Sequence, residues 1–528
     1  MSLLAVEDLS VEIDGAPILE RVSMGLGPGE VLGVIGESGS GKSMTALAVM
    51  GLLPRGARAS GRVLLGGADL LARTEAEMCA IRGRDVGMIF QEPMTALNPL
   101  QTIGDQVAET VRVHGRASRA EARAVARATL DRVGLPEGRF PLERFPHELS
   151  GGQRQRVGIA MAIALRPRLL IADEPTTALD VTTQAAILVL LRRLVDEDGM
   201  GLVLITHDLA VVAETAARVA VMTGGKVVEA GATRDALRAP RHPYTRTLIA
   251  ASAHRPARLP RIARTPLLKV EGLTRDYPGP RRGLFGRETP TRAVRNVSFT
   301  LHAGESLGLV GESGCGKSTL MRAVLGLDRV QAGRIVLDGD EIRAGEAMAP
   351  EIRARMQAVF QDPYGSFDPR WRVGRLVAEP FHLLDDAPRG EERAAAVVSA
   401  LEAVGLAAAD AEKFIHEFSG GQRQRIAIAR ALIIRPKLIV LDEAVSALDV
   451  RVRAQVLDLL GGLSTRYGLS YLFISHDLHV VRAITDRVLV MRAGEIVESG
   501  PTRRVFERPS HPYTRELLAA TPVLEMAG

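Results

Sequence analysis

Runs rich in apolar residues recur along the chain in matching pairs. Three lie in the first half, at residues 31–36, 168–174 and 201–208, and three in the second, at residues 306–311, 437–443 and 470–477. Continuous apolar runs of this length suit buried strands of a parallel sheet covered on both faces. The pattern therefore predicts an α/β fold with a parallel core sheet in each half.

Other periodicities surround these runs. Residues 5–13 and 267–277 alternate between apolar and polar positions, as half-buried strands do. Ser118 and Glu121 form a capping-box pattern before a stretch with helical spacing, and residues 391–404 repeat that spacing in the second half. We therefore expect a helical middle segment in each half.

The landmarks of the two halves keep a constant spacing. Four pairs are each 269 residues apart: Ser150 and Ser419, Asp173 and Asp442, His207 and His476, and His242 and His511. One offset shared by different motifs indicates two homologous domains. We predict these domains at residues 1–253 and 267–528, with a linker of prolines and arginines at residues 254–266.

Two segments fall outside the repeat. The offset rises from 264 to 275 early in the second half, which locates an insertion around residues 280–291. It is either a solvated hairpin or a contact with headgroups or a permease. In the linker, arginines recur with the period of a polyproline helix, at Arg255, Arg258, Arg261 and Arg264. A solvated spacer and a contact with an acidic surface or lipid both stay open for the linker.

Composition narrows the class of protein. The chain has 528 residues, 46% of them hydrophobic, and a net charge of +5 that gives little reason to expect a nucleic-acid partner. No apolar run is long enough to span a bilayer, and the first ten residues do not resemble a secretory signal, so we expect a cytoplasmic chain. The only cysteines are Cys79 and Cys315, which excludes a disulfide framework and a cysteine-ligated metal cluster. We interpret Cys315 as neutral to function and accessible to alkylation.

Two glycine-rich segments carry the strongest chemical signal: GESGSGKS at residues 36–43 and GESGCGKS at residues 311–318. Such a loop lets backbone N–H groups converge on an anion at a helix N-terminus, while its lysine reaches the terminal phosphates. Only six of the 67 basic residues are lysine, yet each segment keeps one. We predict that these loops are two phosphate cradles, with these binding residues: Gly36, Ser38, Gly39, Gly41, Lys42, Ser43 and Met44, and Gly311, Ser313, Gly314, Gly316, Lys317, Ser318 and Thr319.

The segments LSGGQRQR at residues 149–156 and FSGGQRQR at residues 418–425 resemble the signature of ATP-binding cassette (ABC) ATPases. With the cradles, the resemblance covers the whole chain. It implies two P-loop NTPase domains, each a RecA-like core with an antiparallel β subdomain and a helical subdomain. It also implies that each signature closes on the cradle of the other domain. The residues that it assigns there are Ser150, Gly152, Gln153 and Asp180 at the second cradle, and Ser419, Gly421, Gln422 and Asp449 at the first.

Acidic residues end the second apolar run of each half. Asp173 and Asp442 are costly to bury unless they meet a cation, and we expect Mg²⁺ there. The adjacent Glu174 and Glu443 are candidates for the general base that activates water. The resemblance adds two switch histidines, His207 and His476, and two loop glutamines, Gln91 and Gln361. It also implies that these glutamines bind the metal together with Ser43 and Ser318.

The loop glutamines also resemble those through which the family contacts its transmembrane partners. The segments that follow, residues 94–104 and 364–374, are therefore predicted to face a partner. Trp371, the only tryptophan, lies there as an interface candidate, with core packing as the alternative.

Each half departs from the family pattern once. Many relatives stack adenine on an aromatic residue, and Tyr277 fits this role in the second half, but no aromatic residue precedes Phe90 in the first. We therefore expect weaker nucleotide binding at the Lys42 cradle. Pro175 follows Glu174, whereas Ala444 follows Glu443, and the loss of a proline frees the backbone and puts hydrolysis at the second site in question.

Both halves close on His-Pro-Tyr-Thr (HPYT), at residues 242–245 and 511–514. This ending resembles importer ATPases that serve oligopeptides, dipeptides, nickel and glutathione. The resemblance implies an ATP-hydrolysing importer subunit, with peptides as the expected solute, two separate permeases and an extracytoplasmic solute-binding protein. It would lie at the cytoplasmic face of the inner membrane, with no nucleic acid and no iron–sulfur cluster, since no cysteine follows Cys315.

Three alternatives stay open. One is a soluble tandem-cassette ATPase that acts on ribosomes or nucleic acid, although a long charged linker and zinc cysteines are missing. Another is an importer for nickel or glutathione. The third, a scaffold that binds ATP without hydrolysing it, is disfavoured by the intact Glu174 and Glu443.

Overall fold

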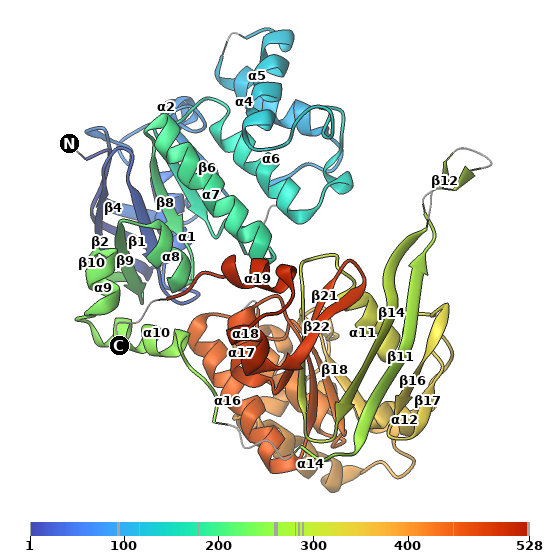
Figure 1. Ribbon diagram of the computed structural model, residues 1–528. Coiled ribbons are helices and arrows are strands. Elements are labelled where there is room, and N and C mark those ends of the chain that lie inside the picture. Colours follow the sequence, from blue (N-terminus) through green and yellow to red (C-terminus); the bar gives the residue numbers. More distant parts are fainter. Residues whose placement is uncertain are drawn as a thin grey trace.

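The computed structural model describes residues 2–91, 96–115, 117–177, 179–257, 262–279, 281–282, 286–287, 290–446 and 448–524. It folds into two similar bodies, one from each half of the chain, shown one above the other in Figure 1. Each body holds a mainly parallel sheet, an antiparallel sheet beside it and a group of helices at one side. The predicted fold class is confirmed.

The core sheet of the first half is built from the continuous apolar runs. Three of its strands are buried throughout, between helices on one face and the antiparallel sheet with α1 (Lys42–Val49) on the other. The partly exposed edge strand β10 (Lys226–Ala232) runs antiparallel to its neighbour. In spatial order the strands are β10, β9 (Arg218–Thr223), β3 (Val31–Ile35), β8 (Gly201–Ile205), β7 (Leu169–Asp173) and β6 (Val86–Ile89).

The alternating segments form the antiparallel sheet. Its first strand buries Leu4, Val6, Leu9 and Val11, alternate side chains on either side of a register shift between Val6 and Leu9. These side chains pack the sheet against α1 and the core sheet in one apolar cluster. In spatial order the strands are β2 (Ala16–Leu26), β1 (Leu4–Ile13), β4 (Ala57–Leu65) and β5 (Ala68–Asp69).

The helical middle segment is confirmed, and Ser118 caps its helix through the predicted capping box with Glu121. The helices of the first half are α1 (Lys42–Val49), α2 (Glu75–Ile81), α4 (Ile103–His114), α5 (Arg119–Arg132), the 3₁₀ turn η1 (Pro146–Glu148), α6 (Gly151–Ile163), α7 (Val181–Asp198), α8 (Leu209–Thr215), α9 (Thr233–Arg238) and α10 (Pro243–Ser252).

The second half repeats both sheets in the same strand order. Its antiparallel sheet is β14 (Thr291–His302), β11 (Pro266–Tyr277), β16 (Ala332–Leu337) and β17 (Asp340–Ile342). Its core sheet is β18 (Met356–Val359), β19 (Leu438–Asp442), β20 (Ser470–Ile474), β15 (Ser306–Val310), β21 (Arg487–Arg492) and β22 (Glu495–Pro501).

The helices of the second half follow the same plan. They are α11 (Lys317–Val324), α12 (Pro350–Arg355), α13 (Val373–Val377), η2 (Glu379–Leu383), α14 (Gly390–Ala403), η3 (Ala408–Glu412), η4 (Ile415–Glu417), α15 (Gly420–Leu432), α16 (Val450–Tyr467), α17 (Leu478–Ile484), α18 (Thr502–Glu507) and α19 (Pro512–Ala519). Trp371 is partly buried against the core of this half, with the Arg375 guanidinium 3.8 Å from its ring.

Two segments join or extend the halves. The insertion carries a short antiparallel pair, β12 (Arg281–Arg282) with β13 (Gly286–Arg287), which projects beyond β11 and β14 in Figure 1. The predicted linker lies between the end of α10 and the start of β11, and its residues 258–261, with Arg258 and Arg261, lie outside the described residues.

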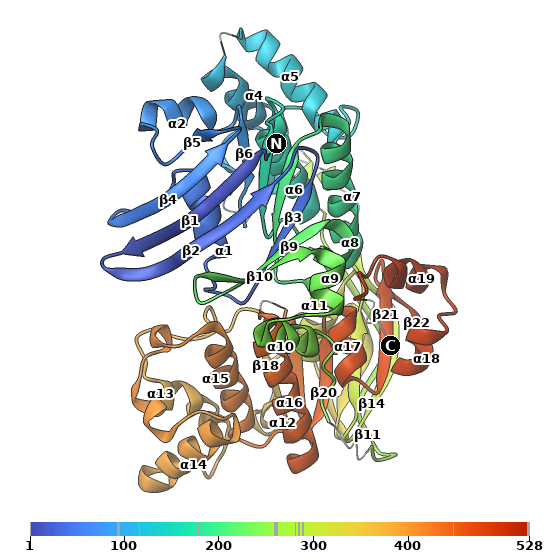
Figure 2. The same ribbon diagram turned by 90° about the vertical axis from the view of Figure 1, so that its left-hand side faces the viewer.

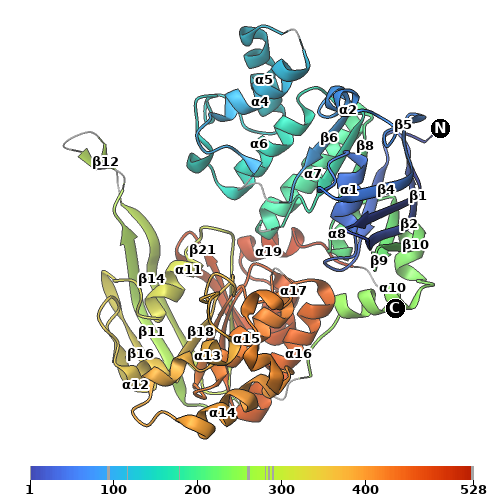
Figure 3. The ribbon, with the colours of Figure 1, turned by 180° about the vertical axis from the view of Figure 1, so that it is seen from behind.

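The halves meet through their terminal helices. Helix α10 of the first half packs against α16 of the second, and α19 of the second contacts α7 of the first. Figures 2 and 3 show these crossings from the side and from behind. His254 adds an ion pair across the join, its Nε2 lying 2.7 Å from Asp458 Oδ1. Each half thus contacts the other through its own terminal helix.

Candidate functional site

Each phosphate cradle lies between the central strand of a core sheet and the helix that follows. The first glycine of the loop has no room for a side chain, because a Cβ on Gly36 would lie 2.2 Å from the carbonyl oxygen of Met222. Gly311 meets Met491 at the same distance. The loop backbone therefore turns tightly over the sheet edge, with its N–H groups at the start of α1 or α11.

The cradle lysines are buried and bridge their own loops. Lys42 Nζ donates to the carbonyl oxygens of Gly36 and Glu37, at 2.8 and 2.7 Å. Lys317 does the same with Gly311 and Glu312, at 2.7 and 2.8 Å. Burial lowers the pKa of Lys42, and the negative charges around it, Glu174 foremost, oppose that shift. Both ammonium groups thus lie in the loop where a negatively charged ligand would bind.

The strand-end aspartates lie beside the cradles. Burial raises the pKa of Asp173, and in the second half burial, with the neighbouring Glu443 charge, raises the pKa of Asp442 to about 6. Asp173 Oδ1 is buried and has no hydrogen-bond partner among the described residues. A buried carboxylate oxygen without a partner is costly, and a divalent cation would relieve that cost. The donor set of carboxylate and serine hydroxyl fits Mg²⁺, a cation that prefers oxygen ligands.

Glu174 sits where the chain bends sharply after β7. Its φ of +48° is unusual for a residue with a side chain, and such strained positions gather at functional sites. Its carboxylate accepts hydrogen bonds from Thr177 Oγ1 at 2.9 Å and Gln91 Nε2 at 3.2 Å, and His207 Nδ1 lies 3.4 Å away. Burial alone would raise the pKa of Glu174, but His207, Thr177 and Lys42 lower it to about 2.

Glu443 repeats this geometry without the proline. Its φ is also +48°, and the following turn closes with Ser446 N donating to Glu443 O at 3.1 Å. His476 Nδ1 lies 3.0 Å from the Glu443 carboxylate, closer than in the first half. However, the Ser446 hydroxyl donates to the Glu443 carbonyl instead of the carboxylate. The missing proline therefore leaves the backbone unchanged, and the two carboxylates differ in their partners.

The second cradle opens onto a cavity of about 310 Å³ that brings together many of the residues predicted for that site, but its lining does not include Ser150, Gly152, Gln153 or Asp442. Asp180, from the first half, lines it together with residues of the second half. These residues are Ala293, Ser313, Gly314, Gly316, Lys317, Ser318, Thr319, Gln361, Glu443 and His476. At the first cradle, the charge of Asp449 from the second half acts on Lys42. Each half thus brings an aspartate to the cradle of the other.

Direct bonds join each cradle to the opposite half. Arg451 lies 2.8 Å from the Glu37 carboxylate, and the Thr182 hydroxyl donates to the Glu312 carboxylate at 2.9 Å. Arg451 and Thr182 are 269 residues apart, so they occupy the same position in the repeat. Sequence reasoning did not single out these four residues. The sequence signal that could have indicated these contacts is the glutamate that follows the first glycine in both cradles.

The signature serines cap their own helices. Ser150 and Gln153 form a capping box at the start of α6, and Ser419 and Gln422 do so at the start of α15. Both serines are exposed. Gly152 is needed for packing, since a Cβ there would lie 2.3 Å from Thr183 Cγ2 on α7. Gly421 meets Val452 of α16 in the same way.

Tyr277 ends β11 beside the second cradle. Its hydroxyl donates to Asp328 at 2.7 Å and lies 3.5 Å from Thr319 Oγ1, while the Arg275 guanidinium lies 4.4 Å from its ring. Ile13 ends β1 at the matching position of the first half. The weaker nucleotide binding expected at the first cradle stays a prediction.

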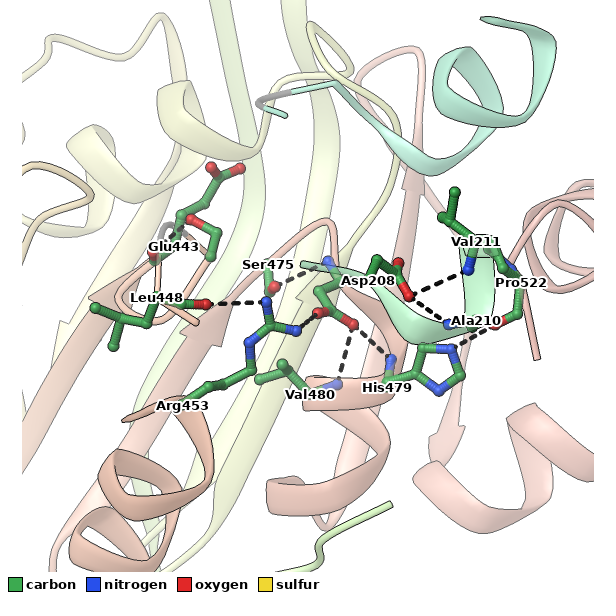
Figure 4. Close-up of polar contacts among 12 residues, drawn as sticks. Asp208, Ala210, Val211, Glu443, Leu448, Arg453, Ser475, His479, Val480 and Pro522 are labelled. Atoms are coloured by element: carbon green, nitrogen blue, oxygen red, sulfur yellow. Dashed lines mark hydrogen bonds and ion pairs between the residues drawn. The ribbon is translucent and has the colours of Figure 1, made fainter. Parts of the chain in front are cut away.

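The helices that follow the switch histidines differ between the halves. Asp208 caps α8 by accepting from the backbone N of Ala210 at 2.9 Å, and Asp477 caps α17 in the same way. In the second half, Arg453 also reaches Asp477 at 2.7 Å and donates to the Leu448 carbonyl (Figure 4). His479 Nε2 lies 2.9 Å from the Pro522 carbonyl oxygen, which ties the C-terminal segment to this helix (Figure 4).

Comparison with known proteins agrees with this geometry. The family described as "ABC transporter" matches residues 19–177 and 294–446, and "Oligopeptide/dipeptide transporter, C-terminal region" matches residues 228–268 and 497–527. The chain belongs to the ABC transporter family. It is an ATP-binding, ATP-hydrolysing subunit of an importer of the oligopeptide and dipeptide type.

Two relatives span almost the whole chain, and a solved structure covers about half of it. The glutathione import ATP-binding protein of Salmonella choleraesuis (strain SC-B67) is 49% identical over 96% of this chain and 87% of its own length. That of Escherichia coli (strain K12) is 48% identical over 99% of this chain and 90% of its own length. A solved ATP-binding cassette dimer with ADP and phosphate is 28% identical and covers 45% of this chain and 99% of its own, with a TM-score of 0.40. As in the sequence analysis, no described helix of this ABC protein has the length and apolar character needed to cross a bilayer.

One expectation about the site is wrong. Cys315 was expected to be accessible, but it is buried in the turn of the second cradle, with Sγ 3.9 Å from Lys317 Nζ. Burial raises the pKa of its thiol, which disfavours the reactive thiolate. Its place in a tight turn under the loop explains why a thiol in a binding segment is shielded.

This burial predicts selective alkylation. In the folded chain, iodoacetamide at neutral pH is expected to modify the exposed Cys79 at least about tenfold faster than Cys315, because the latter is shielded and protonated. Peptide mass mapping over time measures both rates. In denaturant the two rates should converge, and equal rates in the folded chain would contradict the buried position.

Proposed function

We propose that this chain powers the import of small peptides of the glutathione type through two separate permeases. The observation that carries this proposal is the near full-length identity with glutathione import ATP-binding proteins, together with an oligopeptide/dipeptide transporter region in both halves. The same observation disfavours the alternative of an ATPase acting on ribosomes or nucleic acid. An extracytoplasmic binding protein would deliver the solute, and the chain would lie at the cytoplasmic face of the inner membrane.

In each half the cradle lysine would bind the phosphates of ATP, and neighbouring side chains would bind Mg²⁺. Lys42 and Lys317 exchange their loop carbonyls for phosphate oxygens when the nucleotide binds. Ser43, Gln91 and Asp173, and Ser318, Gln361 and Asp442, would hold Mg²⁺, which when bound neutralises phosphate charge. The fit rests on the buried Oδ1 of Asp173, which has no hydrogen-bond partner within the described part of the chain.

Hydrolysis would depend on releasing Glu174 from its present partners. The carboxylate is bound to Gln91, Thr177 and His207, and of these His207 and Thr177 keep its pKa low and its basicity weak. If His207 turns to the γ-phosphate, the hydrogen bond that lowers the pKa of Glu174 is lost and the carboxylate becomes a better base for water. Glu443 and His476 would act alike in the second half.

Closure of the two halves would complete each site. Asp180 already lines the second cavity, while the signature serines are exposed at the starts of α6 and α15. A helix N-terminus binds anions well, so moving α6 onto the second cradle and α15 onto the first would add donors to the γ-phosphate. ATP would then clamp the halves and hydrolysis would release them.

The surface beside each loop glutamine suits a permease. In the second half a cavity of about 820 Å³, lined by Leu327, Phe360 and Gln361, opens between α12 and η2. The first half exposes Leu52 and Phe90, the equivalents of Leu327 and Phe360 in the repeat. Exposed apolar residues paired at matching places indicate contact surfaces. Two such surfaces match two permeases, and motion of the helical subdomains would reach them there.

Replacing both candidate bases tests the assignment of the catalytic residues. We expect Glu174→Gln with Glu443→Gln to lower steady ATPase activity by about 100- to 10,000-fold, because no carboxylate remains to accept the proton from water. The doubly substituted chain should retain bound ATP in a closed state, measured by nucleotide retention on gel filtration. Glu197→Gln, at a surface ion pair with Arg132, is the matched control and should keep the wild-type rate. A wild-type rate in the double variant would refute the role of these glutamates.

Uptake by cells tests the solute. A strain lacking this chain should lose uptake of labelled glutathione, and the wild-type chain should restore it while the double glutamine variant should not. Affinity purification of the tagged chain with an ATP analogue should recover two multi-spanning permeases. Unchanged glutathione uptake alongside loss of nickel or longer-peptide uptake would reassign the solute. Recovery of ribosomal or DNA-repair proteins without permeases would overturn the import proposal.

A further inference from the structure

The HPYT motif begins the terminal helix of each half, and its first two residues fix where that helix starts. His242 Nδ1 accepts a hydrogen bond from the backbone N of Tyr244 at 3.2 Å, so the imidazole caps α10. Pro243 takes the first helical position, where no N–H is needed. The backbone N of His242 donates to Glu229 at 3.1 Å, which anchors the cap to β10. His511, Pro512 and Glu498 repeat this arrangement at α19.

The tyrosine of the motif, so placed, reaches the phosphate cradle. The Tyr244 hydroxyl accepts a hydrogen bond from the backbone N of Glu37 at 3.1 Å, across 207 residues of sequence. The Tyr513 hydroxyl accepts one from the backbone N of Glu312 at 3.0 Å, across 201 residues. Tyr513 is 1% exposed, and Arg492 lies 4.8 Å from its ring. The same bond thus forms independently in both halves.

The backbone amide that each tyrosine binds lies where the loop also contacts the cradle lysine and the opposite half. Glu37 follows the first glycine of the cradle, and its carbonyl oxygen accepts from Lys42 Nζ on the other side. Lys42 Nζ also donates to the carbonyl oxygen of Gly36, so the peptide unit between Gly36 and Glu37 is held at its N–H by the tyrosine and at its carbonyl by the lysine that would reach the phosphates. The Glu37 side chain meets Arg451 of the opposite half. A shift of this one residue would move the loop, its lysine and a contact between the halves.

We propose that Tyr244 and Tyr513 are positioning residues for the two phosphate cradles, each holding its loop in the shape that receives ATP. This inference rests on the cradle assignment proposed above. Each tyrosine would act through the backbone N of Glu37 or Glu312 and not through its own contact with the phosphates. Since α10 packs on α16 of the other half, the hydroxyl also links the cradle to the terminal helix that joins the halves.

Single-site chains make the test specific. In a Lys317→Ala background only the first cradle should bind a fluorescent ATP analogue. Tyr244→Phe is expected to weaken that binding about three- to tenfold, the range for the loss of one partly buried hydrogen bond. Tyr513→Phe in the same background removes the same bond from the disabled half and is the matched control. It should leave the affinity within twofold. Tyr513→Phe in a Lys42→Ala background should show the loss at the second cradle.

Kinetics separate positioning from general stability. In otherwise native chain, the tyrosine variants should raise KM for ATP more than they lower kcat, because the loop binds the triphosphate in the ground state and the transition state alike. Tyr471→Phe removes a buried hydroxyl bond to Leu460 of α16, a bond that involves no cradle residue, and should leave KM unchanged. Equal weakening by Tyr244→Phe and Tyr513→Phe at one cradle would indicate a merely structural role and overturn the proposal.

The cradle assignment can fail separately from this inference. If Lys42→Ala in the Lys317→Ala background keeps nucleotide binding, the cradles are wrong. If it abolishes binding while Tyr244→Phe leaves affinity unchanged, only the tyrosine inference is wrong. Amide hydrogen exchange on the native chain needs no variant: the amide of Glu37 should be protected without nucleotide, and free exchange there would also overturn the proposal.

Discussion

The backbone N–H groups at the start of α1 and α11 have no hydrogen-bond partners within their own helices. The rest of each half is arranged around this anion-binding helix start. The strand before each helix ends in a turn that only glycine can make, so the helix begins directly over the sheet edge. In a parallel sheet the carboxyl ends of all strands meet at one edge. For that reason Asp173, which ends β7, and His207, which follows β8, both lie at the edge that carries the first cradle.

The second constraint is that two such edges face each other. The glutamate next to the first cradle glycine receives Arg451 in one half and Thr182 in the other, at matching positions of the repeat. A salt bridge and a neutral hydrogen bond differ in strength and salt dependence. Arg453 and its partner Asp477 add a further difference, since Gln184 stands at the position of Arg453 in the first half. The duplicated sites are alike in backbone and unequal in side chains.

The terminal helices α10 and α19 connect the two halves and the two cradles. Each half ends in a helix that packs on the other half, while the tyrosine at its start bonds back to the cradle of its own half. The nucleotide loop, the tail and the opposite domain therefore form one connected set of contacts. A chain with both domains fused needs no separate subunit to bring these edges together.

The sequence alone determined the local chemistry: the apolar runs predicted the core strands, the Ser118 and Glu121 pattern predicted a helix start, and two cradles and two signatures indicated ABC ATPase domains. Such features depend on short-range rules of periodicity, capping and glycine geometry. Tertiary structure decided what lies far apart in sequence: the burial of Cys315, the cavity that receives Asp180, and the bonds of Glu37 to Arg451 and Tyr244. Contacts across some two hundred residues or more follow from how the sheets and halves pack, which no local pattern encodes.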